Sequence, residues 1–370
     1  MPLIPKTPKK VWLHSFIQES LQIGKAYSLT AHQLTHKLDQ NESPFDWPLD
    51  LKKKVCSKLL ETEWNRYPSP YSQELIERLA DYTQVLPKHV IPSPGSNQLI
   101  GTLLNLFSHH PSGDIFIARP SFPLYESHCK FHNISYKTWD LDGNFQYQCD
   151  NLKGIKSGSV VFFASPNNPI GNALSYHDLE ALLKDHPSSL FIADEAYYEF
   201  AEKPYTPLLE QYSNLIILRT LSKAMGSAGL RLGYVLASEE VINLIRKLTL
   251  PFMLNHFNII AACELLQDEN IVKEMQEKVS LIRQEREELK TFLQKTGEKS
   301  GFSVIPSQAN FLLLKWQEQD SCQRIYQTLI KKNILLRDVS QGGGALEGCL
   351  RLTIGNKEEN SYVKKIFSEI

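Results

Sequence analysis

Several patterns that would assign a function class are absent from this sequence. No run of about 18 apolar residues occurs, which excludes a helical membrane span. Lys and Arg number 40 against 41 Asp and Glu, giving a net charge of −1, so no basic excess is present to neutralise the phosphates of a nucleic acid. No Gly-x-Gly-x-x-Gly follows an apolar run, which argues against a nicotinamide-dependent dehydrogenase.

Cysteine is present but forms no recognisable framework. The six cysteines are scattered without a Cys-x-x-Cys pair, so neither a zinc site nor a disulfide scaffold is expected. The N-terminus carries positive charges but has no apolar stretch long enough for a secretory signal. We therefore expect a soluble cytoplasmic protein with free thiols and no bound metal; the cysteines are Cys56, Cys129, Cys149, Cys263, Cys322 and Cys349.

The chain does have the composition and length of a globular protein of about two domains. Between residues 42 and 267, helical patterns such as Gln73–Thr83 and Gln98–Phe107 alternate with short apolar runs. Runs of this kind are typical of buried strands in a mostly parallel sheet that is covered by helices on both faces. The predicted strands are Ile115–Ala118, Val160–Ala164, Leu190–Ala193, Leu215–Leu218 and Leu232–Leu236.

The pattern changes after residue 267. Residues 268–296 are highly charged, with apolar residues at helical spacing, and predict a long helix that leaves the large domain. Strands at 309–314, 334–337 and 350–354, with helices at 322–332 and at the end, predict a smaller α+β domain over residues 268–370. Residues 1–41 are too few to bury a core and are interpreted as an N-terminal arm. The predicted fold class is α/β, with the large domain at 42–267.

Four short motifs lie at the ends of predicted strands. They are SPNNPIG around Asn168, IADEAYYEF around Asp194, LRTLSKAMG around Lys223 and AGLRLGY around Arg231. Because ligands of open α/β sheets bind outside the carboxyl ends of the strands, these motifs are expected to meet at one site.

The residue types in these motifs suit pyridoxal 5′-phosphate (PLP). This cofactor needs a lysine that bonds to its aldehyde, which Lys223 provides, and a carboxylate beside its pyridine nitrogen, which Asp194 provides. Asn168 and Tyr197 can hydrogen-bond the phenolate oxygen of the ring. Taken singly, each residue has an ordinary structural explanation, such as a surface charge, a helix cap or a core tyrosine. The ordered set is what predicts the cofactor.

The phosphate of the cofactor needs a cluster of hydrogen-bond donors. A turn of small residues in SPGSNQLIG opens an apolar-periodic helix, and the free N–H groups of such a helix start bind phosphate. The predicted phosphate ligands are Gly95, Ser96, Asn97, Thr220, Ser222 and Arg231.

The order Asn-Asn-Pro, Asp-Glu-Ala-Tyr, Leu-Arg-Thr-Leu-Ser-Lys and Gly-Leu-Arg-x-Gly resembles the fold-type I PLP-dependent aminotransferases. More narrowly, the chain is similar to the histidinol-phosphate aminotransferase family from about residue 38 to the C-terminus. The resemblance implies the cofactor roles given above, with Lys223 as the cofactor-bonding residue. It also places Phe122 where the family usually has a tyrosine stacked on the cofactor ring.

The resemblance further implies a substrate site and a homodimer. Tyr67 matches a tyrosine that reaches the phosphate site of the neighbouring subunit, which implies shared active sites. Arg351 matches the arginine that binds the substrate carboxylate, and Arg337 matches one associated with the substrate's far end. The implied reaction is transamination between L-histidinol phosphate and 2-oxoglutarate.

Departures from the family pattern leave the amino donor open. Asn97-Gln98 stands where the family usually has Asp-Glu, Ile170 replaces a Thr, and Ser43 replaces an Asn. An aromatic amino acid is one alternative donor, because Phe122 and the apolar stretch 251–254 could line an aromatic pocket. Decarboxylation of an amino acid phosphate on the same cofactor is a second. A regulator that senses a metabolite is disfavoured because the chain has no basic helix-turn-helix pattern.

Overall fold

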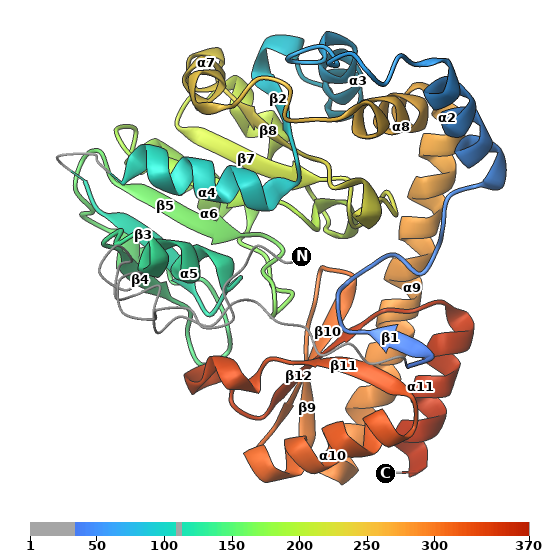
Figure 1. The fold of residues 1–370 in the computed structure, drawn as a ribbon. Helices are drawn as coiled ribbons and strands as arrows, with labels where there is room; N and C mark the ends of the chain where they lie inside the picture. The colour runs from blue at the N-terminus through green and yellow to red at the C-terminus, as the bar shows by residue number, and fades with distance from the viewer. Residues whose placement is uncertain (1–33, 109–112, 370) are drawn as a thin grey trace, which may run out of the picture.

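A computed structural model describes residues 34–108 and 113–369 of the 370-residue chain. Its large domain is built on a seven-stranded sheet of order β2-β8-β7-β6-β5-β3-β4, in which only β8 runs against its neighbours (Figure 1). This confirms the predicted α/β class with a mostly parallel sheet. The strands are β2 (Val90–Ser93), β3 (Ile115–Arg119), β4 (Lys137–Asp140), β5 (Val160–Ala164), β6 (Leu190–Asp194), β7 (Leu215–Thr220) and β8 (Gly233–Ala237).

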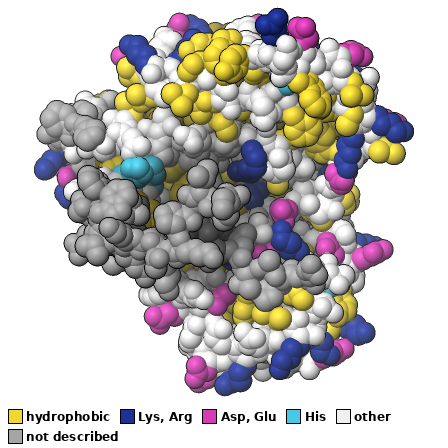
Figure 2. All heavy atoms as spheres, viewed as in Figure 1, with side chains coloured by type: hydrophobic (Ala, Val, Ile, Leu, Met, Phe, Trp, Pro, Cys, Tyr) yellow, Lys and Arg dark blue, Asp and Glu magenta, His cyan; other side chains and the backbone are white. Residues whose placement is uncertain are grey.

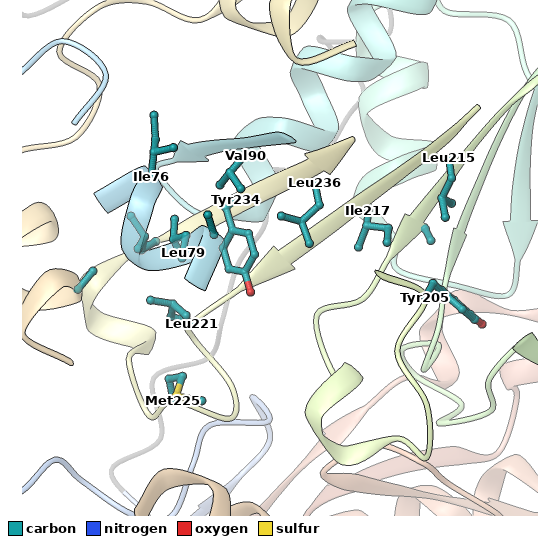
Figure 3. Close-up of a cluster of buried hydrophobic side chains, with 14 of the residues drawn as sticks. Ile76, Leu79, Val90, Tyr205, Leu215, Ile217, Leu221, Met225, Tyr234 and Leu236 are labelled. Carbon is teal, nitrogen blue, oxygen red and sulfur yellow. The ribbon is translucent and has the colours of Figure 1, made fainter. Parts of the chain in front are cut away.

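Both faces of this sheet are buried, which explains the uninterrupted apolar runs in the sequence. Along β5, Val160 and Phe162 belong to one core cluster while Val161 and Phe163 belong to the other. Helices α4 (Ser96–Phe107), α5 (Leu124–Phe131) and α7 (Glu239–Leu248) cover the first face. The second is covered by α2 (Leu49–Glu61), α3 (Gln73–Thr83), α6 (Tyr176–Asp185) and α8 (His256–Gln267), and part of its core is drawn in Figure 3.

The smaller domain is a five-stranded sheet of order β1-β11-β12-β10-β9 with helices packed on one face. Helix α9 (Glu269–Ser300) runs along one side of the molecule from the large domain to this sheet (Figure 1). The remaining elements are β1 (His36–Leu38), β9 (Phe302–Ile305), β10 (Phe311–Trp316), α10 (Gln319–Lys331), β11 (Ile334–Asp338), β12 (Cys349–Thr353) and α11 (Lys357–Glu369).

The segment that we interpreted as an N-terminal arm contributes to the second sheet. Its residues His36–Leu38 form β1 and pair in parallel with β11, while residues 1–33 lie outside the described part of the chain. Within residues 34–108 and 113–369, no helix combines the length and apolarity needed to cross a bilayer.

Candidate active site

The carboxyl edge of the large sheet gathers the predicted motifs. Strands β2, β3, β5, β6 and β7 all point toward this edge, and the antiparallel β8 begins there. The loops at the edge therefore bring together residues that are far apart in the sequence, namely Gly95, Ser96, Phe122, Asn168, Asp194, Thr220, Ser222, Lys223 and Arg231.

Asp194 is the last residue of the central strand β6 and is only 7% exposed. Its Oδ2 accepts a hydrogen bond from the Tyr125 hydroxyl at 2.7 Å, and its Oδ1 accepts one from the backbone N–H of Ala196 at 3.1 Å. Burial raises the pKa of this carboxyl to about 6, although both donors act to lower it. Asp194 is thus a buried carboxylate held by two neutral donors.

Lys223 follows β7 by three residues, in the loop that leads to β8. Its Nζ donates to the backbone carbonyl of Gln40 at 2.9 Å. Burial lowers the pKa of the Lys223 ammonium to about 7, and the nearby guanidinium groups of Arg351 and Arg231 act in the same direction, while Glu42 opposes them. A large part of the Lys223 side chains is therefore uncharged near neutral pH, as a nucleophilic amine requires.

The turn before α4 forms a cradle of backbone groups. Gly95 has φ +80° and caps the helix, which begins at Ser96, two residues earlier than predicted. A Cβ on Gly95 would lie 3.0 Å from Nη2 of Arg231, and a Cβ on Gly233 would lie 2.3 Å from the backbone nitrogen of Ser96. Glycine is therefore required at both positions for the guanidinium and the helix start to come together. Asn97, the next residue, is exposed.

Two hydroxyls complete this side of the site. Thr220 Oγ1 lies 2.9 Å from Ser222 Oγ and accepts from the backbone N–H of Ser222 at 3.1 Å. Thr220 Oγ1 also lies 3.0 Å from the carbonyl oxygen of Leu232. Both side chains are buried, and their hydrogen bonds link the two ends of the loop between β7 and β8, which also carries Arg231.

The smaller domain supplies two arginines on neighbouring strands. Arg337 of β11 and Arg351 of β12 are directly paired in the antiparallel register, so their side chains project from the same face of the sheet. Nη1 of Arg351 donates to Oδ1 of Asn168, and Nη2 donates to the carbonyl of Asp39 at 2.6 Å. The structure thus connects Arg351 with Asn168, two residues that the sequence analysis had assigned separately to substrate and cofactor.

Three predicted aromatic residues, Tyr197, Phe122 and Tyr67, lie at different distances from the site. The Tyr197 hydroxyl accepts from Nδ2 of Asn41 at 3.0 Å, and its ring lies 5.8 Å from Nζ of Lys223. Phe122 makes an edge contact with Tyr125 beside Asp194. Tyr67 lies elsewhere: it is 80% exposed and stacks on Phe252, so the chain does not bring it into its own site.

Comparison with known proteins identifies the family. A family model described as aminotransferase class I and II matches residues 35–366. The chain belongs to this family. The histidinol-phosphate aminotransferase of Pyrococcus furiosus is 36% identical over 333 residues, which cover 90% of this chain and 91% of that protein. That of Caldanaerobacter subterraneus is 31% identical over 362 residues, covering 97% and 99%.

A solved structure agrees with the fold. The PLP complex of the histidinol-phosphate aminotransferase from Sinorhizobium meliloti matches with a TM-score of 0.80 and 21% identity, covering 96% of this chain and 97% of that one. The chain is therefore a PLP-dependent aminotransferase of fold type I, as the motifs predicted.

The residues of this aminotransferase fit the cofactor. Asp194 is a buried carboxylate whose two donors are neutral, so a protonated pyridine nitrogen can supply the missing positive charge. Lys223 offers an amine whose pKa is lowered toward neutrality by burial and by Arg351. The turn at Gly95 has a positive φ, lies against Arg231 and provides N–H donors for a phosphate.

Sequence reasoning missed several residues of the site. Tyr125 holds Asp194, and three successive residues contact the predicted site groups: Asp39 through its carbonyl, Gln40 through its carbonyl and Asn41 through its amide. Asn41 has φ +54° and is fully buried, and asparagine tolerates this conformation better than most residues. No strand was predicted beside these residues, because residues 1–41 were interpreted as an arm.

Proposed function

We propose that this aminotransferase transfers the amino group of L-histidinol phosphate to 2-oxoglutarate. The observation that carries the choice of donor is the direct pairing of Arg337 with Arg351 on one face of the small sheet. Two guanidinium groups on one face of a sheet can bind the same anion together. A phosphate-bearing donor supplies such an anion, and arginine is suited to bind it. The relatives described above carry the same activity in their names.

The residues of the chain divide the work of the reaction. PLP, when bound, would supply an electron sink. Lys223 Nζ would hold the aldehyde end of the cofactor and, as a free amine, would accept the proton from the substrate Cα. Asp194 would keep a proton on the pyridine nitrogen, and Asn168 and Tyr197 would hydrogen-bond the phenolate oxygen. The phosphate would be held by Gly95, Ser96, Asn97, Thr220, Ser222 and Arg231, and Phe122 would pack on the ring.

An absorbance titration of the holoenzyme tests the donor. L-histidinol phosphate, glutamate, phenylalanine and tyrosine are added separately, and the visible band of the bound cofactor is followed. We expect histidinol phosphate to bleach the band at the lowest concentration and 2-oxoglutarate to restore it. Bleaching by the aromatic amino acids alone would replace the proposed donor but leave the aminotransferase activity. Release of carbon dioxide without consumption of a keto acid would instead indicate the decarboxylase alternative.

We also propose a homodimer with shared active sites. Tyr67, Leu250, Phe252 and Phe257 are exposed, and Tyr67 stacks on Phe252 with ring centroids 4.6 Å apart. The loop between α2 and α3, which carries Tyr67, contacts α8 through Nε2 of His256, which lies 3.0 Å from the Arg66 carbonyl oxygen. Figure 2 shows hydrophobic side chains gathered on the upper part of this face, where α7 and α8 lie in Figure 1. An exposed apolar patch of this kind favours a protein partner.

Mixing two inactive variants tests whether sites are shared. Lys223→Ala removes the amine, and Tyr67→Ala removes the side chain proposed to reach the neighbouring site. In a hybrid dimer, one site carries both defects and the other carries neither, so we expect activity to reappear on mixing. If Tyr67 served its own subunit, no hybrid site would be intact and activity would stay absent.

Six free cysteines support a reducing compartment, and we propose the cytoplasm.

A further inference from the structure

Tyr125 is a buried polar residue that was not among the predicted site residues. It is the second residue of α5, directly after the loop that leaves the carboxyl end of β3, and it is 1% exposed. Its ring packs against Phe122 and Phe162 with centroid distances of 5.8 and 6.3 Å. Its hydroxyl donates to Oδ2 of Asp194 at 2.7 Å. The aromatic packing therefore fixes the direction of a hydrogen bond to the carboxylate.

The charge balance around Asp194 gives this hydrogen bond a specific consequence. The titratable groups that act on the carboxyl are Tyr125 from α5, Tyr147 from the loop after β4, and Glu195, the next residue in the chain. The charge of Glu195 is offset by its ion pair with Arg219 at 2.7 Å. Burial raises the pKa of the Tyr125 phenol well above its usual value, so this group stays a proton donor at every working pH.

A carboxyl and a pyridine nitrogen that share one proton can exist as an ion pair or as two neutral groups. A low-dielectric site favours the neutral arrangement, in which the carboxyl takes the proton. A hydrogen bond donated to the carboxylate stabilises the ionised form and so favours the ion pair. We propose that Tyr125 is a positioning residue that keeps the shared proton on the cofactor's ring nitrogen rather than on Asp194. The inference rests on PLP at Asp194 and is independent of the amino donor.

The test compares the native holoenzyme with Tyr125→Phe and a matched control, Tyr147→Phe. The Tyr147 hydroxyl donates to the carbonyl of Ala164, so the control loses a hydroxyl near Asp194 without losing a donor to it. Each protein is loaded with PLP labelled with ¹⁵N in the ring, and the nitrogen signal reports whether the ring is protonated. In the apoprotein, ¹³C-labelled aspartate gives the pKa of Asp194 directly.

We expect the native ring and the control ring to be protonated and the Tyr125→Phe ring to be largely unprotonated. The pKa of Asp194 in apo Tyr125→Phe should rise by about one to two units, the size expected for a buried hydrogen bond to a charged group. Turnover (kcat) should fall by roughly 10- to 100-fold with little change in KM, because the ring protonation acts on the chemical step.

Three outcomes would overturn the inference. The first is an unchanged ring signal in Tyr125→Phe, even with lower activity, because the tyrosine would then act through packing alone. The second is an unchanged pKa of Asp194 in the apoprotein, which decides the matter even if the variant binds PLP poorly. The third is an unprotonated ring in the native enzyme, which would leave the transaminase assignment intact.

If Tyr125→Phe does not fold, 3-fluorotyrosine at position 125 keeps the ring and strengthens the donor. The pKa of Asp194 should then fall, and a rise or no change would contradict the proposal.

Discussion

The buried ion pair between Glu195 and Arg219 gives a prediction whose size follows from its contacts. Both residues are 1% exposed, and Nε and Nη2 of Arg219 donate to Oε2 of Glu195 at 2.8 and 2.7 Å. The guanidinium also donates to the Thr206 hydroxyl and lies 3.6 Å from the centroid of the Tyr198 ring, while Oε1 of Glu195 accepts from the Tyr205 N–H. Removing Arg219 therefore leaves the carboxylate of Glu195 buried without its ion-pair partner.

We expect Arg219→Met to lower the free energy of unfolding by about 3–5 kcal/mol, the cost of an uncompensated buried charge. Glu195→Gln should cost less, because the buried Glu199 also acts on the charge of Arg219. The double variant should cost less than the sum of the two, because no lone charge then remains. The measurement is urea unfolding of the apoproteins, followed by tryptophan fluorescence, so that cofactor binding does not contribute.

Lys88→Met is the matched control. Lys88 and Glu239 lie 2.9 Å apart, but both side chains are about half exposed. Water screens this pair, so its loss should change stability by no more than about 1 kcal/mol. The reasoning is refuted if Arg219→Met costs no more than Lys88→Met, or if the effects of the two buried substitutions simply add.

Three further predictions concern the site. Burial and Arg351 lower the pKa of Lys223 to about 7, so the rate of PLP addition to the apoprotein should rise with pH and level off above about pH 7. Arg351→Gln should move this rise to higher pH. In the native protein, a rise near the ordinary pKa of lysine would contradict the assignment. Arg337→Gln should raise KM for histidinol phosphate roughly tenfold in steady-state assays, and an unchanged KM would contradict the proposed donor site. Gly95→Ala should weaken PLP binding about tenfold, because its Cβ would displace Arg231 at a positive φ; fluorescence titration of the apoprotein would show this, and native affinity would refute it.

How far the fold could be predicted depended on burial. Strand β5 was predicted residue by residue and β7 was found but two residues too short, because strands buried on both faces are continuously apolar. Strand β4 was missed: it lies at the sheet edge and only Trp139 of its four residues is buried. Strand β2 was also missed, since Pro92 weakens any strand pattern in a run of four residues.

The site residues divide in the same way. The chemistry requires the residue types of Lys223, Asp194 and Arg231 at strand ends, and the fold places all three at one edge, while their roles stay predictions. Tyr125 was not predicted, because a tyrosine among apolar residues at the start of a helix has the pattern of a core residue. Its hydroxyl reaches the site because α5 packs against β6 on one face of the sheet and so places Tyr125 beside Asp194.

The segment after β1 shows most clearly why tertiary pairing limits sequence reasoning. The backbone carbonyls of Asp39 and Gln40 accept hydrogen bonds from Arg351 and Lys223. Every residue type has such a carbonyl, so the side chains at positions 39 and 40 do not reveal these contacts. What places these carbonyls is the parallel pairing of β1 with β11, almost 300 residues away along the chain. Since β1 is three residues long and lies at the edge of its sheet, its own sequence cannot specify that partner. The partner is specified by the core of the smaller domain, and the site therefore depends on both domains being folded.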